Sequence, residues 1–138
     1  MRKPLLLITI CVAVTFVFFG CRVAYTQQAN PMKATLTVGQ SVKVPATDVK
    51  VTLEEVLEDS RCPTGTTCIW AGDATVSITI ASANNGPWKF TLHTNGQSAQ
   101  EAQHDGVLVR LMDVAPYPTV DGPPKREAYR VSFSITKK

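Results

Sequence analysis

YRVSFSIT, residues 129–136, alternates large apolar and polar side chains at every position. Successive side chains of an extended chain point to opposite faces, so this period of two predicts a strand with one buried face. Shorter candidate strands precede it at residues 34–38, 41–44, 49–53, 76–80, 88–92 and 107–111. About seven short strands predict an all-β domain, either an antiparallel sandwich of immunoglobulin-like type or a small barrel.

The segments between these strands favour antiparallel pairing, because they are too short for helical crossovers. Asn84-Asn85-Gly86 tolerates positive φ and predicts a hairpin between residues 76–80 and 88–92. The alternation slips at Glu54-Glu55, which indicates a β-bulge. Two longer loops are expected, one at residues 59–70 and a proline-rich one at residues 115–126.

The first twenty residues have the pattern of an export signal. Arg2 and Lys3 precede an uncharged, mostly apolar run at residues 5–19, which is shorter than the roughly 20 residues of a membrane span. Gly20-Cys21 then resembles the bacterial lipobox. We therefore expect a lipoprotein signal peptide at residues 1–20, a flexible tether at 21–33 and a single β-sandwich domain at 34–138.

Two alternatives stay open, because Phe18 and Phe19 replace the residues that a lipobox prefers before its cysteine. The segment could stay as an uncleaved anchor, or cleavage could occur near Ala24 or Ala29. An acylated Cys21 would make the membrane a partner. Such a protein would be exported and lipid-anchored in the bacterial cell envelope, at the outer membrane in a Gram-negative cell.

Charge argues against nucleic acid as a partner. The net charge of +3 falls by two, to +1, once Arg2 and Lys3 are removed. A nearly neutral domain has no general field to attract a polyanion.

The four cysteines divide by position. Cys11 lies in the apolar run and Cys21 is the lipidation candidate, which leaves Cys62 and Cys68. In an oxidising compartment this pair is expected to form a disulfide, with two free thiols as the alternative. Closing so short a loop stabilises the fold by roughly 2–2.5 kcal/mol.

Two strings around these cysteines, DSRCP at residues 59–63 and CIWAG at 68–72, are distinctive. They resemble the signature DSRCP…CxWAG of a family of bacterial secreted proteins and lipoproteins. The resemblance covers most of residues 36–136 and includes PYP at 116–118. It implies the disulfide and the β-domain, and it implies no activity, since none is established for that family.

The candidate binding loop comprises Asp59, Arg61, Trp70 and, further along the chain, Tyr117. In a structural interpretation, Asp59 pairs with Arg61 or accepts backbone N–H groups, while Trp70 covers the disulfide. In a functional interpretation, the loop presents Arg61 and Trp70 to an envelope protein, since Arg and Trp are favoured anchors.

Motifs for catalysis, metals and cofactors are weak. No nucleophile or phosphate-binding motif occurs in the sequence, and the spacing of Cys62, Cys68, His93 and His104 matches no zinc module. The polar segment between the histidines is expected to be a solvated loop. We therefore expect no enzyme, no cofactor and no metal, but an envelope lipoprotein with a binding or structural β-domain. The alternatives are a loop-presenting inhibitor of secreted proteases, and a hydrolase or ligand carrier with an unrecognised site.

Overall fold

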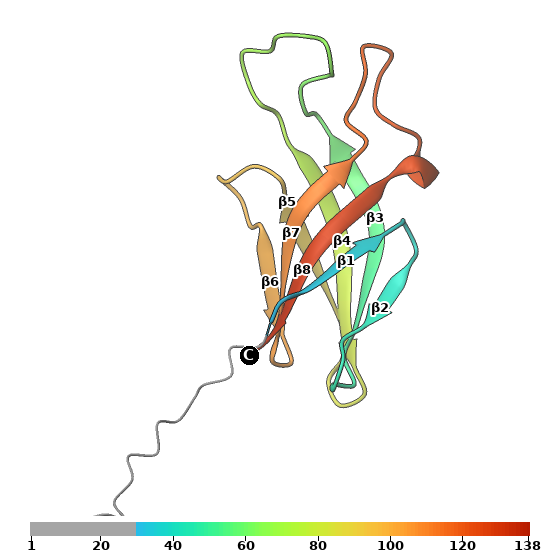
Figure 1. Ribbon diagram of the computed structural model, residues 1–138, viewed down its shortest axis with the longest axis vertical. Coiled ribbons are helices and arrows are strands. Elements are labelled where there is room, and N and C mark those ends of the chain that lie inside the picture. The colour runs from blue at the N-terminus through green and yellow to red at the C-terminus, as the bar shows by residue number, and fades with distance from the viewer. Residues whose placement is uncertain (1–29) are drawn as a thin grey trace, which may run out of the picture.

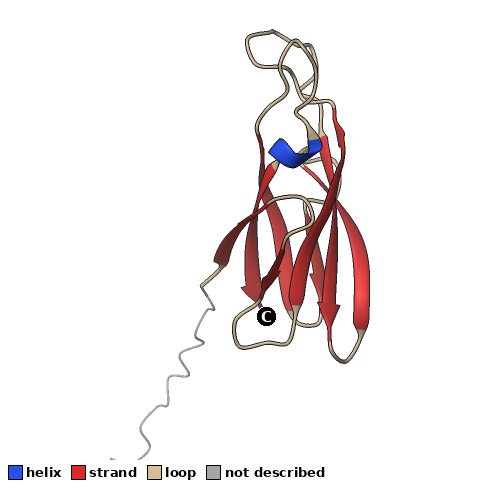
Figure 2. Cartoon of the chain, turned by 90° about the vertical axis from the view of Figure 1, so that its right-hand side faces the viewer, coloured by secondary structure: helices blue, strands red, loops and turns tan. Residues whose placement is uncertain are grey.

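The computed structural model describes residues 30–138, which form two four-stranded antiparallel sheets packed face to face (Figure 1, Figure 2). The strands are β1 (Met32–Leu36), β2 (Ser41–Lys43), β3 (Lys50–Asp59), β4 (Ala74–Ser82), β5 (Gly86–His93), β6 (Glu101–His104), β7 (Val107–Ala115) and β8 (Arg130–Lys137). The all-β prediction is confirmed, and the sheets form a sandwich that does not close into a barrel. The signal peptide predicted at residues 1–20 and Cys21 lie outside the described residues.

Strand order within the sheets is β1-β8-β7-β6 and β2-β3-β4-β5. Apart from β1 and β8, all neighbouring strands are consecutive in the chain, so the connections are meanders rather than the Greek keys of immunoglobulin domains. Backbone pairing is interrupted at two seams, between β1 and β2 and between β5 and β6. Between Lys125 and Tyr129 lies a short 3-10 helix, Arg126–Ala128, and residues 30–138 contain no helix long and apolar enough to cross a membrane.

The core lies between the sheets, where the apolar sides of the strands meet. On β8 the buried residues are Val131, Phe133 and Ile135, which are the positions that the period-two pattern predicts. The hairpin of β4 and β5 is confirmed. The bulge in β3 is confirmed by a register shift between Leu53 and Glu55, and a second shift follows between Val56 and Glu58.

Two boundaries differ from the predictions. The polar segment that was expected to be a solvated loop is one at residues 94–100, but the expectation is wrong for Glu101–His104, which form strand β6. Only Ala102 of this four-residue edge strand is buried, which is too little for a visible alternation. Strand β1 begins at Met32, inside the predicted tether, because its pairing with β8 extends to the partners Met32 and Ile135.

The two ends of the sandwich differ in what they carry, and the strand register shows at which end the chain enters. We call the end that carries the loops at residues 60–73, 94–100 and 116–129 the distal end. Met32 pairs with Ile135 near the last residue of β8, so the chain enters the domain at the opposite, proximal end. Figure 1 shows the β3–β4 and β7–β8 loops projecting side by side, away from the C-terminus.

Candidate functional site

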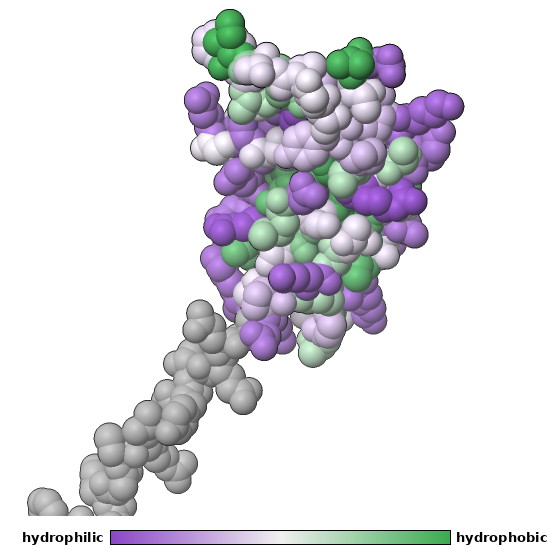
Figure 3. Space-filling view, turned by 45° about the horizontal axis from the view of Figure 1, so that its top comes forward, coloured by the Kyte–Doolittle hydropathy of each residue, from purple (hydrophilic) through white to green (hydrophobic). Residues whose placement is uncertain are grey.

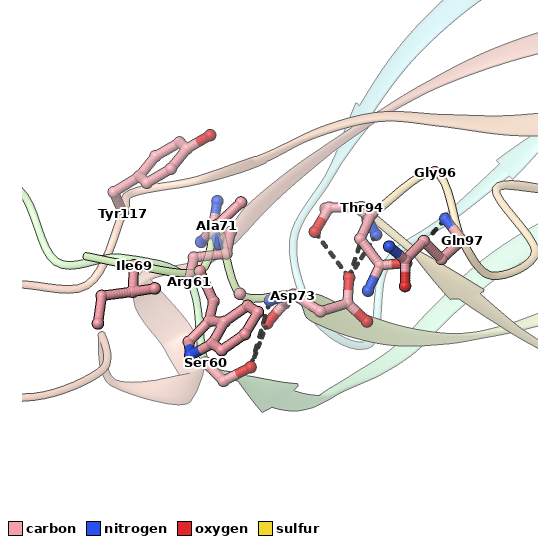
Figure 4. Close-up of a pocket in the computed structure, with 12 residues that line it drawn as sticks. Ser60, Arg61, Ile69, Ala71, Asp73, Thr94, Gly96, Gln97 and Tyr117 are labelled. Carbon is pink, nitrogen blue, oxygen red and sulfur yellow. Dashed lines mark hydrogen bonds between the residues drawn. The ribbon is translucent and has the colours of Figure 1, made fainter.

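The distal end holds an open groove of about 740 Å³ between its three loops (Figure 4). All three loops line the groove: the β3–β4 loop with residues 60–61 and 69–73, the β5–β6 loop with residues 94–97, and the β7–β8 loop with Tyr117. The groove therefore contains three of the four residues of the predicted binding loop, Arg61, Trp70 and Tyr117. Residues 59–73 and 117 are brought together by the fold, because β3 and β7 end at the same side of the sandwich.

Arg61 is the polar centre of the distal end, and only 5% of it is exposed. Its Nε and Nη2 donate to the two carboxylate oxygens of Asp59, at 2.8 and 2.7 Å. Nη1 donates to the carbonyl of Val114, and Nη2 also donates to that of Pro116 at 3.1 Å. The predicted pairing with Asp59 is confirmed, but Arg61 points into the protein and does not act as an exposed anchor.

Asp59 receives a further hydrogen bond from the hydroxyl of Tyr129, at 3.0 Å. Burial and this bond to the Asp59 carboxylate raise the pKa of Tyr129 to about 12. Burial alone would lower the pKa of Arg61, but the hydrogen bonds and the charge of Asp59 raise it above its ordinary value. The ion pair thus joins the end of β3 to both sides of the β7–β8 loop.

Tyr117 is fixed by the same guanidinium. The Cζ atom of Arg61 lies 4.1 Å from the centroid of the Tyr117 ring, which is a cation–π distance. About half of the Tyr117 surface, 49%, nevertheless stays exposed. One side of the ring is therefore held by the protein while the residue remains accessible from the groove.

The base of the β3–β4 loop is held by a short ladder and a covalent link. Cys62 and Cys68 form the predicted disulfide, with Cα atoms 5.8 Å apart. Ser60 N–H donates to the carbonyl of Asp73 at 2.7 Å. Gly72 has φ +69°, and a Cβ there would lie 2.0 Å from the carbonyl oxygen of Ser60, so only glycine fits.

Contacts between loops extend this support. The backbone N–H of Thr64 donates to the carbonyl of Pro118 at 2.9 Å, and its hydroxyl donates to the same oxygen at 3.3 Å. The β3–β4 and β7–β8 loops are therefore joined by two sets of contacts, the hydrogen bonds of Arg61 and those of Thr64.

Trp70 does not have the position that the structural interpretation expected. It is 80% exposed, and the preceding Ile69 is 90% exposed, so Trp70 is not buried against the disulfide. Val120 on the β7–β8 loop is 73% exposed. Figure 3 shows strongly hydrophobic side chains at two corners of this end, with a less hydrophobic surface between them.

Asp73 is a central residue of the site that the sequence analysis did not include in the binding loop. Its Oδ1 accepts from the N–H and hydroxyl of Thr94, both at 2.9 Å, and from the N–H of Asn95 at 3.0 Å. Its Oδ2 lies 2.6 Å from Nδ1 of His93. Burial alone would raise the pKa of Asp73, but the hydrogen bonds from His93, Asn95 and Thr94 hold it below its usual value.

His104 lies outside the groove, at the seam between β5 and β6. Its ring centroid is 5.2 Å from that of Trp88 and 6.2 Å from that of Phe90. Its Nε2 is 3.3 Å from a carboxylate oxygen of Asp105, without hydrogen-bond geometry. Among residues 30–138, no three His, Cys, Asp or Glu side chains are grouped as metal ligands.

The geometry of the groove suits binding by uncharged contacts. Its two charged residues, buried Arg61 and half-buried Asp73, are both hydrogen-bonded within the protein, and the surface of the groove also carries aromatic rings and side-chain amides. No family model, curated protein or solved structure matches the chain.

Replacing Arg61 by lysine should destabilise the domain by about 2–4 kcal/mol, although the charge is kept. Lysine has no planar fork, so it cannot reach the Asp59 carboxylate and the carbonyls of Val114 and Pro116 together. Urea unfolding measures the loss. The matched control is Arg126→Lys, because Arg126 pairs with Glu55 at 3.3 Å on the exposed surface, where a change of at most about 0.5 kcal/mol is expected. Equal stabilities of the two variants would contradict this account of Arg61.

Replacing Tyr129 by phenylalanine should cost about 1.5–3 kcal/mol at neutral pH, because the hydrogen bond to the Asp59 carboxylate is lost. The pKa of Tyr129 is raised from 10.0 to about 12 by folding. Its contribution is therefore complete below about pH 10 and is lost as the pH rises through about 12. Between about pH 10 and 12, the unfolding free energy should fall less steeply with rising pH for Tyr129→Phe than for wild type. Identical pH dependences would refute the hydrogen bond from Tyr129 to Asp59 as the cause.

Proposed function

We propose that the chain is a non-enzymatic envelope lipoprotein, anchored through an acylated Cys21, whose distal end binds another component of the compartment. The observation that carries the proposal is the gathering of exposed apolar side chains on the loops of one end. These side chains are Ile69, Trp70, Tyr117 and Val120.

Ile69, Trp70 and Val120, at 73–90% exposure, exceed the exposed apolar residues found elsewhere among residues 30–138, which are Leu57, Trp88 and Met112 at 54–57%. Ile78, Leu53 and Phe133 have 0–1% of their surface exposed, whereas Ile69 and Trp70 have 90% and 80%. Ile69, Trp70 and Tyr117 line one groove, and exposed apolar side chains grouped in this way often mark an interaction site. The disulfide and the hydrogen bonds between the loops keep these side chains presented, so binding would not have to order the loops.

The position of the chain entry fits an anchored protein. Met32 lies at the proximal end and follows the lipidation candidate Cys21 by eleven residues in sequence. Strand β8 has eight residues, which at about 3.3 Å each span roughly 26 Å between the two ends. A lipid attached at Cys21 would therefore hold the domain by one end and leave the distal loops free to meet a partner.

Binding is favoured over catalysis by the state of the two charged side chains in the groove. The carboxylate of Asp73 accepts hydrogen bonds at both oxygens, and the Arg61 guanidinium is bound to Asp59 and two carbonyls. Neither group is poised to exchange a proton with a substrate or to stabilise a developing charge.

Mass spectrometry of the protein from its native host tests the anchor. The expected mature N-terminus is Cys21 carrying fatty acyl groups, and Cys21→Ser should lose the modification and partition into the soluble fraction. Cys62→Ser is the matched control, because it removes a cysteine that is not at the lipobox. A chain that keeps Met1 or begins after Cys21, without bound fatty acid, would refute the lipoprotein assignment.

Site-specific photo-cross-linking in the same host tests binding at the distal end. A photoreactive residue at position 69 should yield adducts with another envelope component, because Ile69 is almost fully exposed. The control position is 84, in the exposed β4–β5 turn at the proximal end. Equal adduct yields from both positions would show that the distal end has no special role.

A further inference from the structure

We propose that the distal groove binds a neutral glycan, an uncharged oligosaccharide whose sugar rings pack on Trp70 and Tyr117. This inference rests on the proposed function, because it names the class of partner that the distal end takes. It is carried by three features of the lining: charged side chains that are already hydrogen-bonded within the protein, two exposed aromatic rings of which Tyr117 is held by Arg61, and side-chain amides with unused hydrogen-bonding capacity.

The charges of the lining favour a neutral ligand. Arg61 and Asp73 are its only charged residues. Arg61 is 5% exposed and directs its donors to Asp59 and to backbone carbonyls. Asp73 is surrounded by donors from His93, Thr94 and Asn95. A charged ligand would lose hydration on entering the groove without gaining a free countercharge, whereas an uncharged ligand would not meet this cost.

The aromatic residues provide the apolar part of the surface. Tyr117 is held against the guanidinium of Arg61 at 4.1 Å and is still 49% exposed, and Trp70 is 80% exposed. The rings of many hexoses have a face of C–H groups, which packs on an aromatic ring by burial and weak C–H contacts. Because one face of Tyr117 is already fixed, little side-chain freedom remains to be lost when a sugar binds.

The opposite side of the groove provides hydrogen bonds. Asn95 is held by the N–H of Gln97, which donates to its Oδ1 at 3.2 Å. Within residues 30–138, neither Nδ2 of Asn95 nor the side-chain amide of Gln97 has a hydrogen-bond partner. Amides both donate and accept, as do sugar hydroxyls, so the two sets of groups are complementary.

The dimensions of the groove fit a ligand of several rings. Figure 4 shows Tyr117 and Gln97 at opposite ends of the site, with Asp73 between them. The volume of about 740 Å³ lies within the range of roughly 300–1,000 Å³ that is common for small-ligand sites. An oligosaccharide could therefore contact the aromatic rings with one sugar and the amides with another.

Intrinsic fluorescence of the full-length protein in a detergent without sugar groups tests the inference. The chain has two tryptophans, so Trp88→Phe leaves Trp70 as the only tryptophan reporter. The probes are the neutral tetramers of β-linked N-acetylglucosamine and of β-linked glucose, with an acidic tetragalacturonate as the control. We expect a saturable blue shift with at least one neutral tetramer and no shift with the acidic one. The inference is overturned if neither neutral tetramer shifts the emission, or if the acidic probe binds as well as they do.

Calorimetry on variants of the full chain locates the site. Trp70→Ala should weaken binding of the neutral tetramer about tenfold or more, because an exposed platform is removed. Trp88→Ala is the matched control. Trp88 is 55% exposed on β5, where it pairs with Ile80, and it does not line the groove. The affinity of the Trp88→Ala variant for the tetramer should therefore equal that of wild type. Equal affinities for wild type and Trp70→Ala would place the glycan elsewhere and overturn the inference.

These outcomes separate the glycan from the broader function. Cross-links from position 69 to an envelope protein, without binding of either neutral tetramer, would refute the glycan and keep the distal end as a binding surface. Loss of both the cross-links and the oligosaccharide binding would refute the two together.

Discussion

The buried ion pair between Asp59 and Arg61 is the interaction on which the distal end of this protein depends. Removing two charges from water is costly unless their hydrogen-bonding groups find partners. Here the guanidinium binds both carboxylate oxygens and the carbonyls of Val114 and Pro116, and the Tyr129 hydroxyl binds Asp59. Asp59 lies on β3, Val114 on β7, and Pro116 and Tyr129 at the two ends of the β7–β8 loop. One ion pair therefore connects the two sheets at the end where the chain forms long loops.

A second polar centre repeats this design on the neighbouring loop. Asp73, at the start of β4, gathers donors from residues 93–95 at the end of β5. The two centres use the charged residues of the groove, Arg61 and Asp73, to hold loops, while Trp70 and Ile69 remain outside the core. A domain arranged in this way is stiff where it meets a ligand and nearly neutral at its contact surface, which favours recognition by shape, aromatic packing and uncharged hydrogen bonds.

Much of the fold could be predicted from alternation, because a half-buried strand leaves a period of two in the sequence. The prediction missed β6, whose single buried residue, Ala102, leaves no such pattern. For the site, the pairing of Asp59 with Arg61 is visible because the two are neighbours in sequence. For Trp70 the structural interpretation, which placed it over the disulfide, is wrong, because backbone hydrogen bonds and Gly72 support the loop without a covering aromatic ring.

The sequence by itself determined the strand pattern, the disulfide pair, the local ion pair and the two long loops, because each depends on residues close together along the chain. Only the tertiary structure decided that these loops meet the β5–β6 loop at one end, that Arg61 is buried and that Trp70 is exposed. It also placed Asp73 against Thr94, twenty-one positions away. Such contacts arise from strand register and from the packing of two sheets. These bring together residues that are far apart in the chain and that no local sequence pattern relates.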